Sequence, residues 1–86
     1  MIPVTIVTYT TRHLLYKDKV RFFYALKGRG KQEGIITRCQ IKQLGKTVLM
    51  LKPRFEKDVV SFLKEWKCAF QIIHAQVTDS EYHGLR

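Results

Sequence analysis

The sharpest chemical feature of the sequence is a short basic segment rich in glycine, Lys27-Gly28-Arg29-Gly30-Lys31. Glycine accepts positive φ angles and lets the backbone approach a ligand closely, so successive amides can point at one anion. The side chains of Lys27, Arg29 and Lys31 would add charge around that anion. The segment lacks the GxxxxGK[ST] spacing of a P-loop. It is therefore compatible with a phosphate contact and equally with a plain turn between two elements.

A second basic feature lies in a segment that alternates with a period of two. Arg38, Gln40 and Lys42 would then form a row on one face of a strand, with side chains about 7 Å apart, roughly two strand rises. Adjacent phosphates of an extended single strand have a similar spacing, and an ordinary solvated strand face has the same pattern. Lys46 follows in the next turn and adds a further cation.

Aromatic rings and cations are interleaved between residues 12 and 24. Rings can stack on bases while cations meet phosphates, so this mixture suits a nucleic acid. Tyr9 and Tyr16 are the candidates for exposed base stacking. The basic residues that would extend the patch along the first helix are Lys17, Lys19, Arg21 and Lys27.

Other aromatic residues are expected to serve the core. Phe22, Phe23 and Tyr24 are consecutive on a predicted helix and cannot all point outward, and Phe23 is the one expected inside. Trp66 lies on the apolar side of a second predicted helix. We expect it to be a core residue as well.

The residues that could ligate a metal or act as nucleophiles are Cys39, Cys68, His13, His74 and His83. They show no CxxC or HxxxH spacing, so the sequence predicts no zinc site and no other cofactor. Two cysteines do not make a disulfide framework, and reduced thiols are expected. No nucleophile–base or carboxylate pair converges in the sequence. The chain is therefore predicted not to be an enzyme, with a small hydrolase acting at the basic loop as a minor alternative.

The charge is large and uneven. Sixteen Lys and Arg residues against seven Asp and Glu residues give a formal net charge of +9. Between Arg12 and Arg54 there are twelve basic and only two acidic residues, whereas from Phe55 onward there are four basic and five acidic ones. Such a charge attracts polyanions but says nothing about the fold.

Hydrophobic periodicity and turn residues indicate six elements. The predicted elements are a strand over Val4–Thr10, a helix over Lys19–Lys27 capped by Asp18, strands over Glu33–Gln43 and Thr47–Lys52, a helix from Pro53 to about Trp66, and a strand over Phe70–Val77. Residues 1–77 would form one basic domain, and residues 78–86 a polar, flexible tail.

This order, β-α-β-β-α-β, is that of the ferredoxin-like or split βαβ arrangement. The predicted fold is an α+β two-layer sandwich with a four-stranded antiparallel sheet and two helices on one face. Right-handed crossovers would place the first and third strands in the centre. A different pairing of the same elements is the main alternative.

The sequence thus predicts a small nucleic-acid-binding protein, with RNA preferred over DNA, as a component of a ribosome or another ribonucleoprotein particle. It would dock electrostatically on the phosphate backbone. The alternative is a protein-interaction module that binds an acidic partner or homodimerises through a sheet edge, which the apolar residues of 70–77 favour. With no signal peptide and no apolar run of spanning length, we expect no membrane partner and a cytoplasmic location.

Overall fold

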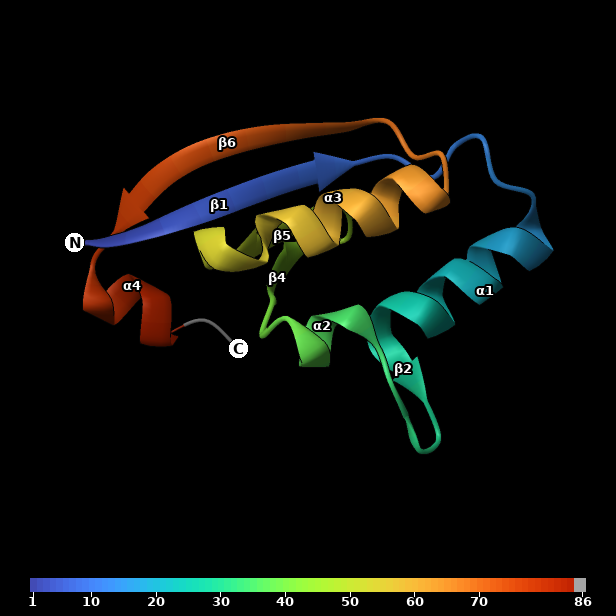
Figure 1. Ribbon diagram of the computed structural model, residues 1–86, viewed down its shortest axis with the longest axis horizontal. Coiled ribbons are helices and arrows are strands. Elements are labelled where there is room, and N and C mark those ends of the chain that lie inside the picture. The colour runs from blue at the N-terminus through green and yellow to red at the C-terminus, as the bar shows by residue number, and fades with distance from the viewer. Residues whose placement is uncertain (85–86) are drawn as a thin grey trace.

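The structure, a computed structural model, describes residues 1–84 of the chain. Figure 1 shows the arrangement of its elements. In chain order these are β1 (Ile2–Tyr9), α1 (Tyr16–Lys27), β2 (Gly28–Arg29), β3 (Gln32–Glu33), α2 (Ile35–Arg38), β4 (Lys42–Gly45), β5 (Val48–Leu51), a 3-10 turn η1 (Pro53–Phe55), α3 (Glu56–Glu65), β6 (Phe70–Val77) and α4 (Asp79–Gly84).

Four strands form one antiparallel sheet in the order β4-β5-β1-β6. β1 and β6 pair over eight residues without a break, from Ile2 opposite Val77 to Tyr9 opposite Phe70. The small hairpin of β2 and β3 projects from the end of α1 (Figure 1). The predicted α+β class and its four-stranded antiparallel sheet are therefore confirmed.

The main core lies between one face of this sheet and the helices α1, α2 and α3. Alternation along β1 points Val7 and Tyr9 into it, because successive strand residues face opposite sides. The helices contribute the buried residues Phe22, Leu26, Ile35, Val59, Phe62 and Leu63. The predicted second helix is confirmed in α3, which Pro53 introduces at the start of η1.

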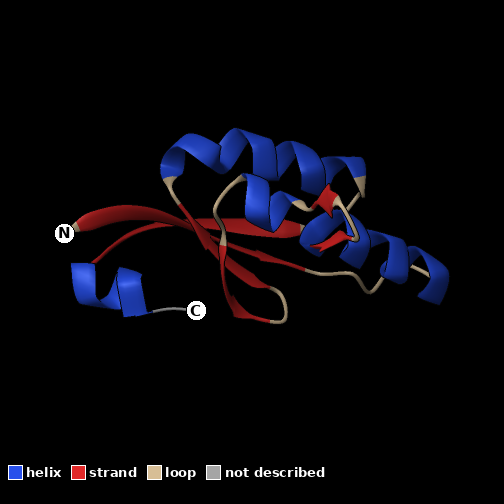
Figure 2. Ribbon diagram, turned by 90° about the horizontal axis from the view of Figure 1, so that it is seen from below, coloured by secondary structure: helices blue, strands red, loops and turns tan. Residues whose placement is uncertain are grey.

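A smaller cluster forms on the opposite face of the sheet, where Val4 and Met50 pack against Tyr82 of α4. Figure 2 shows α4 on the side of the sheet away from α3. The helix begins with a capping box: the amide of Glu81 donates to Thr78 Oγ1 at 3.2 Å, and the amide of Thr78 donates to Glu81 Oε1 at 2.8 Å. The predicted tail therefore starts with a helix whose Tyr82 is buried, and residues 85 and 86 of that tail lie outside the described residues.

The predicted strand over Glu33–Gln43 is wrong in its first part. Residues Ile35–Arg38 form α2, and Gln40 has a positive φ of 53°. The buried pair Ile35 and Cys39 is four residues apart, which is one helical turn as well as two strand repeats. Only Lys42 and Gln43 of the predicted segment lie in the main sheet, as the start of β4, which continues to Gly45 and forms the predicted hairpin with β5.

A close glycine contact fixes where α2 begins. A Cβ at Gly34 would overlap the Leu26 carbonyl and the Gly28 amide, so only glycine allows the chain to return this close to the end of α1. At that end Gly28 has a φ of 94° and closes the helix by donating its amide to the Tyr24 carbonyl.

The start of α1 also differs from the expectation. The helix begins at Tyr16 with Leu15 at the N-cap, and Asp18 lies inside the first turn. Asp18 therefore does not cap the helix. Its carboxylate still lies beside the positive end of the helix dipole, where an acidic residue is favourable.

Candidate nucleic-acid interface

A hollow of about 320 Å³ lies between α1 and the β4–β5 hairpin. Its lining combines cations, hydroxyls and one aromatic face, and consists of Tyr9, Thr11, Phe23, Lys27, Gln43, Lys46 and Thr47. A second hollow of about 440 Å³ adjoins it, because both contain Tyr9, Thr11 and Thr47. The second adds Thr10, Arg12 and Lys19. We call the two hollows together the basic basin.

All charged side chains that line the basic basin, among the residues described, are cations. They are Arg12, Lys19, Lys27 and Lys46. They come from three segments that lie far apart in the chain: the loop after β1, helix α1 and the β4–β5 turn. Their convergence creates a local positive potential that an anion can enter without meeting a carboxylate.

Tyr9 connects the walls of the basic basin. Its backbone amide donates to the Thr47 carbonyl at 3.1 Å, and its hydroxyl donates to the Lys46 carbonyl at 3.0 Å. The turn that carries Lys46 is thereby attached to the end of β1. Burial raises the pKa of the Tyr9 phenol to about 12, so the hydroxyl remains a donor at neutral pH.

Helical spacing supplies the opposite wall. Lys19, Phe23 and Lys27 are four residues apart and form one stripe along α1. The Lys27 ammonium lies 5.9 Å from the centre of the Phe23 ring, within range of a cation–π contact. This stripe offers an aromatic face between two cations, which is suited to a base and its neighbouring phosphates.

Two predictions about aromatic exposure are wrong. Tyr9, expected to be an exposed stacking residue, is only 6% exposed because it packs on Phe22 with ring centres 5.6 Å apart. Phe23, expected in the core, is 40% exposed, and its neighbour Phe22 is the buried one. Neighbouring helical residues point about 100° apart, so only one of the two can face the sheet.

Phe22 is the centre of an aromatic cluster below the basic basin. Its ring lies 5.3 Å from Phe62 and 5.6 Å from Trp66, centre to centre, in edge-to-face contacts. Trp66 packs against the core as expected, although it is not fully buried. This cluster holds α1 against α3 and so keeps the stripe of Lys19, Phe23 and Lys27 in place.

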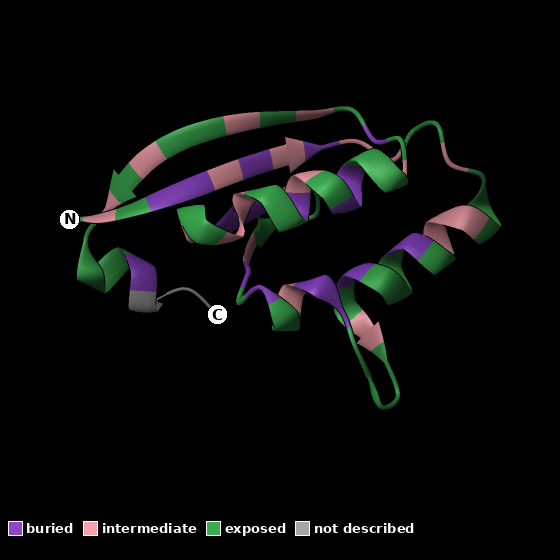
Figure 3. Cartoon of the chain, viewed as in Figure 1, coloured by how far each residue is buried: buried purple, intermediate pink, exposed green. Residues whose placement is uncertain are grey.

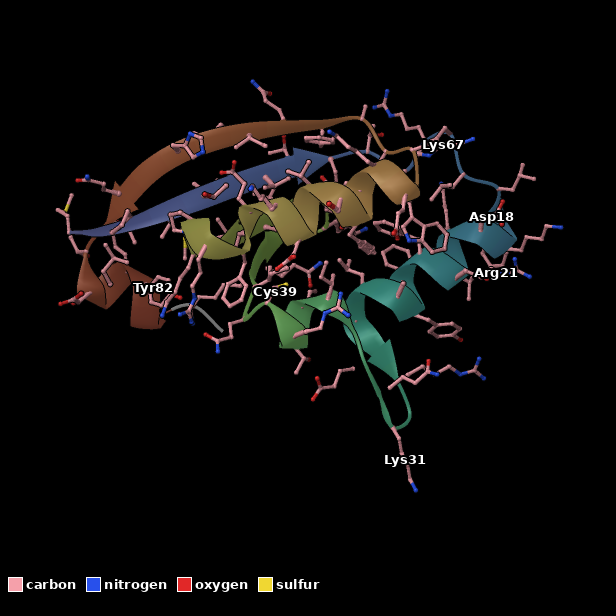
Figure 4. The ribbon with its side chains drawn as sticks, viewed as in Figure 1. Asp18, Arg21, Lys31, Cys39, Lys67 and Tyr82 are labelled. Atoms are coloured by element: carbon pink, nitrogen blue, oxygen red, sulfur yellow. The ribbon has the colours of Figure 1, made fainter. Side chains whose placement is uncertain are left out.

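The other predicted residues of the first helix and the glycine-rich segment lie outside the basic basin. Tyr16, 84% exposed, and the cations Lys17 and Arg21 occupy the outer side of α1. Arg29 covers the ring of Tyr24 at 4.7 Å, and Lys31 points away from the molecule at the hairpin tip (Figure 4).

The segment from Lys27 to Lys31, for which the sequence allowed a phosphate contact or a plain turn, is part of a short hairpin. Its cationic side chains diverge, since Lys27 lines the basic basin while Arg29 stacks on Tyr24. The Gly28 amide is already bonded to the Tyr24 carbonyl. The residues pair across this hairpin, with Arg29 opposite Gln32.

The predicted row of Arg38, Gln40 and Lys42 on one strand face is also wrong. Arg38 lies on α2, and Gln40 lies in the turn that follows it. Lys42 is on β4 with its ammonium 5.0 Å from the centre of the Tyr82 ring, and thus on the α4 side of the sheet. Lys46 is the one predicted cation of this region that lines the basic basin.

A separate hollow of about 410 Å³ lies between α1, α2 and α3. It contains Arg38 together with three carboxylates, Glu33, Asp58 and Glu65, above an aromatic floor of Phe62 and Trp66. We call it the acidic groove. Its charge makes it a poor site for a polyanion.

Among the residues whose side chains are described, the histidines and cysteines form no centre of reactivity. His13 Nε2 donates to the Trp66 carbonyl at 2.9 Å, and both cysteines are free thiols whose pKa values are raised by burial. In the part of the chain that the structure describes, no three His, Cys, Asp or Glu side chains are arranged to hold a metal ion.

One cluster of Thr, Glu and His resembles a catalytic arrangement only in composition. His74 Nε2 donates to Glu56 Oε1 at 2.6 Å, and Thr5 Oγ1 donates to the same oxygen at 3.2 Å. The hydrogen bond from His74 lowers the pKa of Glu56. Thr5 is fully buried opposite His74 in the β1–β6 pairing, so its hydroxyl is not accessible to a substrate as a nucleophile would have to be.

Sequence reasoning missed Arg12 and Phe23 as members of the basic basin. Arg12 follows β1 within three residues, at the strand end where the β4–β5 turn also arrives. The four-residue spacing of Lys19, Phe23 and Lys27 was a usable signal for Phe23. To use that signal, one has to decide which of the adjacent residues Phe22 and Phe23 faces the core.

Comparisons with protein-family models, with curated proteins and with solved structures find no match for this chain. Among residues 1–84, no helix is both long enough and apolar enough to cross a membrane.

Proposed function

We propose that this protein binds nucleic acid, RNA in preference to DNA, by seating phosphates in the basic basin. The observation that carries the proposal is the convergence of Arg12, Lys19, Lys27 and Lys46 around two adjoining hollows that, in the described residues, hold no carboxylate. The hydroxyls of Thr11 and Thr47 add hydrogen-bonding groups for phosphate or sugar oxygens.

The preference for RNA depends on the exposed aromatic rings. Phe23 in the basic basin and Tyr16 on the outer side of α1 offer surfaces for unpaired bases, which is how most sequence-reading RNA proteins engage single strands. Lys17, Arg21 and Arg29 would extend the contact along the outer side of α1. A role within a ribonucleoprotein particle and a cytoplasmic location belong to the same proposal.

We also infer that the fold is a variant of the split βαβ arrangement. The strand order β4-β5-β1-β6, with the first and third strands of the sheet in the centre, supports this inference. The β2–β3 hairpin, α2 and α4 would then be additions to that framework. Because many activities share this architecture, the function is argued from the basic basin alone.

The test is fluorescence-anisotropy binding to single-stranded RNA, duplex RNA and duplex DNA at several salt concentrations. On single strands, log K should fall linearly with log salt by about 0.7 for each neutralised phosphate. Lys27→Ala combined with Lys46→Ala should lower that slope by about 1.4 and weaken binding roughly 25-fold near 0.1 M salt.

The matched control removes two exposed lysines of α3, Lys57→Ala with Lys64→Ala, which lie outside the basic basin. It changes the net charge equally and should leave most of the affinity intact. Equal losses in both double variants would mean that only overall charge matters. Absence of binding at low salt would overturn the proposed function.

A further inference from the structure

The outer edge of β6 is an exposed backbone edge without the usual protection. β6 has eight residues, Phe70–Val77, and none is Lys, Arg, Asp, Glu or Pro. Its pairing with β1 is unbroken by any bulge, and it is the last strand of the sheet on that side. Figure 3 shows no buried residue along β6, whereas the neighbouring β1 has buried residues at Val4, Thr5, Val7 and Tyr9.

The opposite edge of the same sheet is protected. β4 has only four residues, starts with Lys42 and is irregular between Gln43 and Gly45. Short length, charge and a bulge are the devices that stop edge strands from pairing with other chains. The contrast within one sheet indicates that the edge at β6 is available for a partner strand.

The hydrogen bonds of β1 determine which backbone groups of β6 point outward. The Thr10 amide donates to the Ala69 carbonyl, so Ala69 and every second residue after it face β1. The N–H and C=O groups of the remaining β6 residues therefore point toward the outer edge. These residues are Phe70, Ile72, His74 and Gln76.

We propose that a second copy of this chain pairs with β6 through β6, in an antiparallel and two-fold symmetric manner. A two-fold axis requires reciprocal contacts: if residue i of one copy pairs with residue j of the other, residue j of the first pairs with residue i of the second. The outward backbone groups of Ile72 can then form hydrogen bonds with those of His74 in the other copy. This register places the Ile73 residues of the two copies opposite each other on the axis. That central pair is of the non-hydrogen-bonded type, in which the side chains are closest.

The side chains fit this arrangement. Ile73 is 45% exposed on a face of β6 that no helix of the described residues covers fully, and pairing would bury it against its own copy. β6 contains no Lys, Arg, Asp or Glu, so pairing the strand with its own copy takes no such side chain of the strand out of water. Two four-stranded sheets would become one continuous sheet of eight strands.

Charge at the two ends of β6 favours the antiparallel direction. Lys67 lies just before the strand, whereas Asp79 and Glu81 lie just after it. Figure 4 shows Lys67 and Tyr82, which belongs to the same helix as Asp79 and Glu81, at opposite ends of the sheet. Antiparallel pairing brings the basic end of one copy beside the acidic end of the other, and a parallel pairing would bring like charges together.

Salt should act on this contact in the opposite direction to its effect on nucleic-acid binding. Each copy carries a net charge of +9, so the two copies repel one another at long range. Added salt screens that repulsion. The dimer should therefore become tighter as salt rises from low to moderate concentration, while affinity for nucleic acid falls.

The first experiment is sedimentation velocity of the whole chain without nucleic acid, over a range of about 1 μM to 1 mM. The wild type should shift from one-chain to two-chain mass. Ile73→Lys should weaken the dimer by roughly tenfold or more, because it places two like charges directly opposite each other.

The control Leu44→Lys adds the same charge at a 40% exposed leucine on β4, the protected edge, and should dimerise as the wild type does. Circular dichroism melting would establish that both variants fold. Neither variant changes a residue of the basic basin, so RNA binding should persist in both, and a failed dimer can be told apart from a failed function.

The register is tested by disulfide trapping. Ile73→Cys should form an intermolecular disulfide under mild oxidation, since Cys39 and Cys68 are buried and compete poorly. Gln71→Cys is exposed on the same side of β6 but would lie about 13 Å from its counterpart, four strand rises away, and should not crosslink. A wild type of one-chain mass at every concentration, or a dimer as tight in Ile73→Lys as in the wild type, would overturn the proposal.

Discussion

Each hollow of the basic basin is similar in size to the acidic groove but opposite to it in charge. Their volumes are comparable, with hollows of about 320 and 440 Å³ in the basin against about 410 Å³ in the groove, and each has aromatic residues in its lining. The basin contains four cations, and the groove contains three carboxylates with one arginine. Volume and aromatic lining therefore do not distinguish the two, and charge does.

This comparison shows that net charge alone is a poor guide to the binding surface. The chain carries sixteen basic residues, yet the structure brings only a few of them together in a concave site. Several cations predicted to meet phosphates are dispersed. Arg38 faces carboxylates, Lys42 lies over Tyr82 on the other side of the sheet, and Lys31 is isolated at a hairpin tip.

The largest expected effect on RNA affinity comes from replacing two cations of the basic basin by carboxylates, so that its charge resembles that of the acidic groove. Lys27→Glu combined with Lys46→Glu removes two attractions and adds two repulsions, which should weaken single-stranded RNA binding by roughly a few hundred-fold near 0.1 M salt. The measurement is fluorescence anisotropy, with melting curves to verify folding. A loss of less than about tenfold would mean that the basin is not the binding site.

The next largest effect is expected from removing the aromatic ring that lines the basic basin. Phe23→Leu retains an apolar side chain but removes the ring, and base stacking is worth about 1–3 kcal/mol per base. Affinity for single-stranded RNA should drop by that amount, while affinity for duplex RNA should change little because paired bases are not accessible. An equal loss for both ligands would assign Phe23 a purely structural role.

A smaller effect is expected from loosening the turn that carries Lys46. Tyr9→Phe removes the hydrogen bond to the Lys46 carbonyl, which should cost about 1 kcal/mol of the free energy of unfolding at neutral pH. Urea denaturation followed by circular dichroism measures this cost.

The raised pKa of Tyr9 also leads to a prediction about the free energy of unfolding at alkaline pH. Burial raises its pKa to about 12 from a usual value of 10.0, so the folded state favours the neutral phenol. That contribution is complete below pH 10 and is lost as pH rises from 10 toward 12. The unfolding free energy of wild type should fall across this window more steeply than that of Tyr9→Phe. If the two pH profiles were parallel, the pKa of Tyr9 would be the same in the folded and unfolded states, and the prediction would be wrong.

The smallest effect is expected in the acidic groove. Arg38→Ala removes a cation that lies among carboxylates, so affinity for RNA should change by less than about twofold, well below the cost of removing a phosphate contact. The same anisotropy titration measures it. A loss comparable to that of Lys27→Ala would mean that nucleic acid also reaches the groove and that the distinction between the two hollows is wrong.

Much of the fold could be predicted from the sequence because its hydrophobic periodicity and turn residues are local and unambiguous. The alternation in β1 and β6 and the apolar stripe of α3 appear where the pattern places them, and the predicted hairpin is present with its turn at Lys46 and Thr47. The segment over 35–41 failed because Ile35 and Cys39 satisfy helical and strand spacing equally well, and the contact of Gly34 with the end of α1 decides between them. The helix α4 was missed although its Thr78–Glu81 capping box is visible in the sequence.

The sequence by itself determined the α+β class, the antiparallel sheet, the excess of positive charge and the identity of Lys19, Lys27 and Lys46 as binding candidates. Only the tertiary structure decided which cations converge, that Phe23 rather than Tyr9 presents an exposed ring, and that β6 leaves an open edge. The physical reason is that charge and periodicity are properties of neighbouring residues. A concave site and a sheet edge are made by segments distant in the chain, whose approach depends on packing around Phe22 and the hydrogen bonds of Tyr9.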